Sequence, residues 1–160
     1  MKNEGFSLVE TLVVIAIIGI MSSIMTPKIS IYLAKAKDTK VISDLSMLRT
    51  ASQMYYLDEG QPLGEENGQI KDYLTDSDLE KIKIYFSGNI NKLETSNENN
   101  DVKEVVGGSR KEKNGQIKLG GNIKYTFKGE EDSSDGINIW IEKDTEMGDY
   151  TINNYKWEEL

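Results

Sequence analysis

The chain has 160 residues, of which 29% are charged, and its formal net charge is −8 at pH 7. This length allows one modest hydrophobic core rather than two domains. Because the sequence contains neither cysteine nor histidine, it excludes a disulfide framework, a thiolate metal site and the most common general base of enzymes.

An apolar segment of membrane-spanning length, GFSLVETLVVIAIIGIMSSIM, occupies residues 5–25 and contains one ionisable residue, Glu10. A carboxylate in hydrocarbon costs at least about 2.5 kcal/mol, so an acid in such a segment indicates a functional site and requires a partner. The next cation along the chain is Lys28, beyond the apolar run. Cleavage between Gly5 and Phe6 would supply an α-amine about one helical turn from Glu10, or one that pairs with Glu10 of a neighbouring copy.

The residues Gly5-Phe-Ser-Leu-Val-Glu10 and the apolar run behind them resemble the processing and methylation site of type IV prepilins and pseudopilins. The resemblance ends near Tyr56. It implies cleavage after Gly5 by a membrane-embedded prepilin peptidase, N-methylation of Phe6, and assembly of a filament through Phe6 and Glu10. The chain would therefore be the substrate of the peptidase.

Two simpler interpretations of the apolar segment remain open. A secretory signal peptide has a short apolar core and a cleavage site after that core, whereas this segment is long and contains Glu10. A plain membrane anchor with an incidental Glu10 is the other interpretation, and the cost of a charge in lipid weighs against it.

We expect four segments along the chain: a leader peptide at residues 1–5, a transmembrane and assembly helix at 6–27, an amphipathic helix at 28–57 and a globular head at 58–160. Pro27 lies where helices of the resembled family are commonly kinked, and a proline inside a helix removes one hydrogen bond. The amphipathic part is indicated by apolar residues at helical spacing, namely Val41, Leu45, Leu48 and Tyr55.

The head is expected to form a small antiparallel β-meander that packs against this helical stripe, which gives an α+β, pilin-like fold. Alternating residues predict strands at 116–119, 122–128 and 136–142, and residues 149–157 are a candidate for a final strand. Gly120-Gly121 predicts a tight hairpin turn between the first two strands. The pattern Ser77-Asp-Leu-Glu80 predicts a short helix over residues 78–83.

Residues 94–115 are polar and rich in Asn, Lys, Glu and Gly, which predicts a long surface loop. Candidate core residues are Phe127, Trp140 and either Ile139 or Ile141, because aromatic residues of alternating strands usually face the buried side of a sheet.

Charge is divided unevenly, with a net +3 over residues 28–57 and −10 over residues 58–160. The acidic head is expected to repel nucleic acid, so no nucleic acid partner is expected for it. The basic stretch has two interpretations: a solvated helix face near lipid headgroups, or a contact with acidic heads of neighbouring copies.

No catalytic residue and no cofactor are predicted, and the chain is not expected to be an enzyme. Calcium is the one ligand to consider, because the major pseudopilins of type II secretion, which this chain resembles at its amino terminus, bind it in a carboxy-terminal loop. The oxygen-rich turns here offer four weak candidate ligands, Asp132, Asp135, Asp144 and Asp149, whose spacing does not match an EF-hand loop. A solvated acidic loop is the simpler interpretation.

The resemblance implies a structural subunit of a type IV pilus or related filament, with prepilin peptidase and the pilus or secretion assembly machinery as partners. The chain would first cross the cytoplasmic membrane once with its head outside, and then enter a homo-oligomeric surface pilus or periplasmic pseudopilus. A pseudopilin of a type II secretion system and a membrane-tethered monomeric binding ectodomain are the alternatives.

Overall fold

The computed structural model describes residues 7–85, 93–95, 100–129 and 134–160. The chain divides into two units, Met1–Leu33 and Ala34–Leu160. Helix α1 (Leu8–Glu59) contributes residues to both units. The secondary structure is α+β, with antiparallel pairing between all the named strands, as the sequence predicted.

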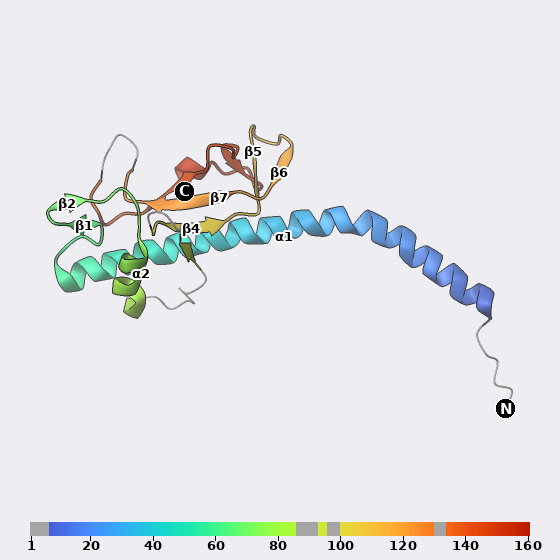
Figure 1. The fold of residues 1–160 in the computed structure, drawn as a ribbon. Coiled ribbons are helices and arrows are strands. Elements are labelled where there is room, and N and C mark those ends of the chain that lie inside the picture. Colours follow the sequence, from blue (N-terminus) through green and yellow to red (C-terminus); the bar gives the residue numbers. More distant parts are fainter. Residues whose placement is uncertain (1–6, 86–92, 96–99, 130–133) are drawn as a thin grey trace, which may run out of the picture. The chain divides into compact units, whose positions relative to one another are not determined.

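The unit Ala34–Leu160 places its strands along one side of the helical segment that ends at Glu59 (Figure 1). One face of this segment carries the predicted stripe, in which Val41, Leu45 and Leu48 are buried and Tyr55 packs at its edge. The stripe also contains four buried residues that its apolar pattern did not indicate, namely Ala34, Asp38, Ala51 and Ser52.

After the helix, a hairpin of β1 (Glu65–Glu66) and β2 (Gln69–Ile70) precedes α2 (Asp76–Ile82) and a 3₁₀ turn, η1 (Lys83–Tyr85). The short helix begins two residues earlier than predicted, because Thr75 rather than Ser77 is its N-cap. The backbone N–H of Thr75 donates to the Asp78 carboxylate at 3.0 Å, which closes the capping box upstream of the predicted one.

The remaining strands form two sheets rather than one meander. The first has the order β3 (Glu94–Thr95), β4 (Val102–Val105), β7 (Asn122–Thr126) and β8 (Trp140–Lys143). The second has the order β6 (Ile117–Leu119), β5 (Gly108–Arg110) and β9 (Tyr150–Thr151), and η4 (Trp157–Glu159) ends the chain.

The predicted hairpin at Gly120-Gly121 is therefore wrong. Strands β6 and β7 flank this pair of glycines but belong to different sheets, so the chain crosses from one sheet to the other here. Both glycines have positive φ, 78° and 138°. Gly120 donates to the carbonyl oxygen of Gly107 at 2.8 Å, and Val106 donates to that of Gly121 at 3.0 Å, which ties the crossing to the end of β4.

The predicted surface loop over residues 94–115 is also wrong for much of its length, because β3, β4 and β5 lie within it. Val102 and Val106 are buried, and so is Glu104 between them. Buried and less buried residues alternate along this strand, but because Glu104 is polar the sequence does not show the alternation as apolar and polar residues. The Glu104 carboxylate accepts a hydrogen bond from the Tyr125 hydroxyl at 2.5 Å and pairs with Lys40 of α1. Burial raises the pKa of Glu104, although these two hydrogen bonds lower it.

Trp140 was predicted in the core and is not in it. Strand β8 turns Ile141 toward the core and Trp140 to the opposite face, where it is partly exposed. Phe127 and Ile139 are fully buried, as predicted. The tryptophan of the core is Trp157 in η4, and no alternating pattern surrounds it.

Three polar side chains of α1 hold the carboxy-terminal region in this cysteine-free chain. The Asp38 carboxylate accepts the backbone N–H groups of Gly107 at 2.8 Å and Ile152 at 3.0 Å. Arg49 donates to the carbonyl oxygens of Ile139 at 2.7 Å and Leu160 at 2.6 Å. The third contact comes from the Ser52 hydroxyl, which donates to the carbonyl oxygen of Ile137 at 2.6 Å.

Candidate functional site

The candidate site is the amino-terminal part of α1, in the unit Met1–Leu33. Every side chain from residue 7 to residue 30 is exposed in the isolated chain, and Leu8 is 80% exposed. Most of these side chains are large and apolar, and α1 is long and apolar enough here to cross a membrane. An apolar surface of this extent requires lipid or other protein surface to cover it.

Three hydroxyl side chains of this helix segment donate to its own backbone. The Thr11 hydroxyl donates to the carbonyl oxygen of Leu8 at 2.9 Å, Ser23 to that of Ile20 at 2.7 Å, and Thr26 to that of Ser22 at 2.8 Å. Such bonds reduce the cost of placing a hydroxyl in hydrocarbon. Glu10 is the one ionisable residue among residues 7–25.

Glu10 forms a reciprocal capping box with Ser7 at the start of α1. The backbone N–H of Ser7 donates to Glu10 Oε2 at 2.8 Å, and the backbone N–H of Glu10 donates to Ser7 Oγ at 3.2 Å. These bonds satisfy two donors that have no partner within the helix. This role of Glu10 was not predicted, although the pattern Ser-x-x-Glu is a known signal for it.

Three further predicted residues of this region are Gly5, Phe6 and Pro27. Gly5 and Phe6, the proposed cleavage pair, lie outside the described residues. Pro27 lies within α1, which remains helical through this residue and ends at Glu59. The predicted kink at Pro27 stays a prediction.

Three of the four candidate calcium ligands lie in the part of the chain that the structure describes, and they belong to no group that could hold a metal ion. Asp135 uses its carboxylate locally, accepting the backbone N–H groups of Ile137 at 2.9 Å and Asn138 at 2.8 Å. Asp149 forms an ion pair with Lys143 at 2.9 Å. Asp132 lies outside the described residues, and Asp144 is exposed. Within those ranges, no group of three or more acidic, histidine or cysteine side chains could hold a metal ion. Calcium binding stays an untested prediction.

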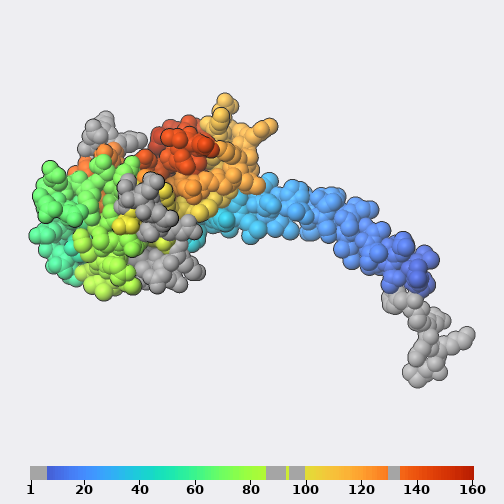
Figure 2. Space-filling view, viewed as in Figure 1, coloured from blue at the N-terminus to red at the C-terminus, as the bar shows by residue number. Residues whose placement is uncertain are grey.

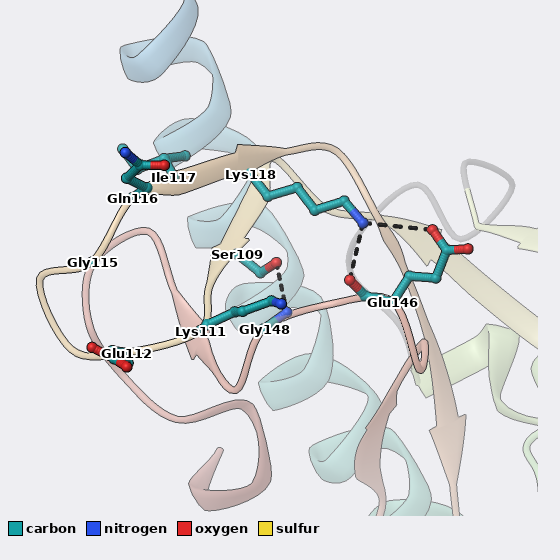
Figure 3. Close-up of a pocket in the computed structure, with 9 residues that line it drawn as sticks. All are labelled: Ser109, Lys111, Glu112, Gly115, Gln116, Ile117, Lys118, Glu146 and Gly148. Atoms are coloured by element: carbon teal, nitrogen blue, oxygen red, sulfur yellow. Dashed lines mark hydrogen bonds and ion pairs between the residues drawn. The ribbon is translucent and has the colours of Figure 1, made fainter.

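A pocket of about 380 Å³ lies in the head over the sheet of β5 and β6 (Figure 3). The buried Ser109 forms part of its lining, and its hydroxyl oxygen accepts the backbone N–H of Gly148 at 2.9 Å. Lys118 reaches across to the carbonyl oxygen of Glu146 at 3.0 Å. None of the residues that line this pocket pairs the Ser109 hydroxyl with a base, so the arrangement does not activate a nucleophile.

Comparison with known proteins points to the same amino-terminal segment. Residues 1–26 match the family described as the prokaryotic N-terminal methylation motif. The predicted resemblance to pilins and pseudopilins is confirmed over this part of the chain.

The similar proteins are of two kinds. The type IV major fimbrial protein FimA of Dichelobacter nodosus is 39% identical over 63 residues, which cover 39% of this chain and 40% of that protein. A fimbrial protein of Pseudomonas aeruginosa is 38% identical over 56 residues, 35% of this chain and 36% of the relative. The type II secretion system core protein G of Klebsiella pneumoniae is 39% identical over 67 residues, 42% of this chain and 48% of the relative.

The chain thus spans less than half the length of each of these relatives. No solved structure matches the chain. The family match covers residues 1–26 and does not extend into the head.

Proposed function

We propose that the chain is a structural subunit of a type IV pilus or a related pilin-like filament. Prepilin peptidase cuts it between Gly5 and Phe6, Phe6 is N-methylated, and the amino-terminal helix assembles it with other copies. One observation carries the proposal: the match to the methylation motif covers the start of a helix whose apolar side chains are exposed and whose apolar stretch contains a single carboxylate, Glu10.

This surface accounts for two successive locations of the chain. In the cytoplasmic membrane, lipid covers the helix while the acidic head lies outside. In the filament, the helices of other copies replace the lipid. Van der Waals packing and hydrogen bonds between helices then hold the subunits together.

Glu10 links the two locations. Its Oε2 atom is taken by the backbone N–H of Ser7, whereas the structure gives Oε1 no partner among the described residues. Oε1 is thus available to the terminal amine of Phe6 on an adjacent subunit, and this pair would remove an uncompensated charge from the apolar interior. A contact that joins different surfaces of identical copies builds a filament unless it closes into a ring.

A pseudopilin of a type II secretion system is the second candidate, and the similarity to core protein G of Klebsiella pneumoniae over 67 residues favours it. A membrane-tethered monomeric binding ectodomain is the third. None of these proposed roles includes catalysis. Deleting the gene separates the first two roles: a pilus subunit is required for surface fibres, and a pseudopilin is required for release of secreted proteins.

The test is the yield of fibres sheared from cells that express Glu10→Ala, with Ser23→Ala as a control in the same apolar segment. We expect Glu10→Ala to be processed and to accumulate in the membrane but to give few fibres, whereas Ser23→Ala gives normal fibres. Normal polymerisation of Glu10→Ala would show that the pairing is wrong. Gly5→Leu should block processing, and full function of that variant would favour the monomeric ectodomain.

A further inference from the structure

Two lysines lie on α1 at the start of the unit Ala34–Leu160. Lys35 and Lys37, here named the basic collar, follow Ala34, the first buried residue of the helix, and lie on opposite sides of the buried stripe. Within the described ranges, neither lysine has a carboxylate at ion-pair distance. By contrast, Lys40 pairs with Asp44 at 2.6 Å and with Glu104.

The other end of the same helical segment is acidic. Residues 58–66 contain four carboxylates and no lysine or arginine, and all four side chains are exposed. These residues, here named the acidic end, are Asp58, Glu59, Glu65 and Glu66. Figures 1 and 2 show the β1–β2 hairpin beside the carboxy-terminal end of α1, so the four acids gather in one region of the unit Ala34–Leu160.

The acidic end is unfavourable in the isolated chain. The carboxy terminus of a helix carries partial negative charge, and the last turn of α1 contains acids but no basic residue. Internal partners compensate only in part: Tyr85 donates to Asp58 at 2.7 Å, and Lys71 lies 3.8 Å from Glu66. Glu59 and Glu65 have no ion pair among the described residues.

The basic collar and the acidic end of one chain do not neutralise each other. The helix between Lys35 and Glu59 spans about 35 Å at about 1.5 Å per residue. This separation is several times the screening length of about 8 Å at physiological salt. A second copy of the chain carries charge that is complementary to both patches.

We propose that the acidic end of one subunit docks against the basic collar of the next subunit, head to tail along the filament. This inference rests on the proposed filament and adds, to the helix packing, a contact between the Ala34–Leu160 units of neighbouring subunits. The contact joins two different surfaces, so it repeats without closing and sets the axial direction of stacking. It also selects one direction of stacking, because turning one subunit end over end would bring two acidic ends or two basic collars together.

Charge reversal and its compensation test the contact in the full-length chain. Lys35→Glu with Lys37→Glu should reduce sheared fibres on the order of tenfold, because like charges would then face each other. Glu59→Lys with Glu65→Lys should do the same. A chain with all four substitutions should recover most of the yield. Lys111→Glu with Lys113→Glu is the matched control, since both lysines are exposed and lie outside the collar.

The outcomes distinguish a contact between subunits from a contact between the collar and lipid. Unchanged fibre yield in the collar variant would overturn the inference while leaving the filament intact. Loss of fibres that the four substitutions do not restore would also overturn it and would indicate that the lysines bind anionic lipid headgroups instead. If the chain builds no filament at all, Glu10→Ala cells and unmodified cells will lack fibres alike.

Crosslinking gives an independent test, because the natural chain has no cysteine. Lys35→Cys combined with Glu65→Cys should give a ladder of covalent multimers in oxidised fibres. A disulfide needs Cα atoms within about 7 Å, so the two positions of one chain cannot bridge each other. Each single variant should stay monomeric, because the contact brings position 35 to position 65 and not to a second copy of itself. A double variant that also stays monomeric, or single variants that form dimers, would contradict the contact.

Discussion

The carboxylate of Asp38 on helix α1 accepts a hydrogen bond from the backbone N–H of Ile152 at 3.0 Å, across 114 residues of sequence. The same carboxylate accepts the N–H of Gly107 at 2.8 Å, and its side chain is fully buried. One helical residue thus holds two distant segments of the head at once. In a chain without disulfides, contacts of this kind fix the carboxy-terminal region on the helix.

Replacing Asp38 by alanine should destabilise the head strongly. The variant leaves the N–H groups of Gly107 and Ile152 without their acceptor, and each buried unsatisfied group costs about 1–3 kcal/mol. We expect the free energy of unfolding to fall by about 2–4 kcal/mol. Thermal unfolding of the full-length chain in detergent measures it. Asp44→Ala is the control, because the partly exposed Asp44–Lys40 pair contributes about 0.3–0.5 kcal/mol. Equal effects of the two variants would contradict this role.

The same carboxylate should make stability depend on pH. Burial raises the pKa of Asp38 above its ordinary value of 3.8, although hydrogen bonds from Ile152, Gly107 and Gly108 lower it. A group with a raised pKa in the folded state binds its proton more tightly there than in the unfolded chain, so its contribution to stability is lost as pH rises through the folded pKa.

Relative to Asp38→Asn, which does not titrate at this position, the natural chain should therefore gain stability as the pH is lowered from about 7 toward about 4. Unfolding midpoints of the two chains across this range measure the difference. Parallel curves, or a natural chain that loses stability relative to the variant on acidification, would show that the hydrogen bonds outweigh burial.

The two tryptophans should behave oppositely. Trp157 is fully buried, so Trp157→Ala should cost about 3–5 kcal/mol. Trp140 lies on the outer face of β8, so Trp140→Ala should cost about 1 kcal/mol. The indole N–H of Trp157 has no hydrogen-bond partner among the described residues, so Trp157→Phe should be milder than Trp157→Ala. Thermal unfolding of the three variants ranks them, and a larger loss for Trp140→Ala would contradict the placement of the core.

Gly107 is required by close contact rather than by its backbone angles. A Cβ atom added there would lie 1.8 Å from the carbonyl oxygen of Ala34, so Gly107→Ala must push the loop away from the helix. We expect a loss of at least about 3 kcal/mol. Gly120→Ala is a suitable comparison, because Gly120 has positive φ but open space around it, and its loss should be about 1 kcal/mol. The same unfolding experiment distinguishes the two, and a tolerated Gly107→Ala would contradict this packing.

The sequence predicted the features that depend on local signals. The spacing of Val41, Leu45 and Leu48 indicated the buried face of α1, and the motif around Glu10 is confirmed by the match over residues 1–26. Helical periodicity and a cleavage motif can each be recognised within a short stretch of sequence, without knowledge of the residues that pack against it.

Features that depend on distant partners were not predicted. Strand β4 lies in a segment that was predicted to be a loop because residues 94–115 are polar and rich in Asn, Lys, Glu and Gly. The burial of its Glu104 is explained by Lys40 and Tyr125, which lie far away in the sequence. The prediction of Trp140 in the core was wrong because an alternating pattern does not show which face of the strand is buried. The crossing at Gly120-Gly121 was predicted to be a hairpin, because two glycines indicate a tight change of chain direction. They do not indicate that the flanking strands belong to different sheets.

The central claim is that the chain is cut and then assembled through its new terminus. Intact mass spectrometry of the chain from membranes and from sheared surface fibres tests it most directly. A fibre-derived mass that corresponds to a start at Phe6 plus one methyl group is the predicted result. A full-length or differently cut chain that is confined to membranes would contradict it.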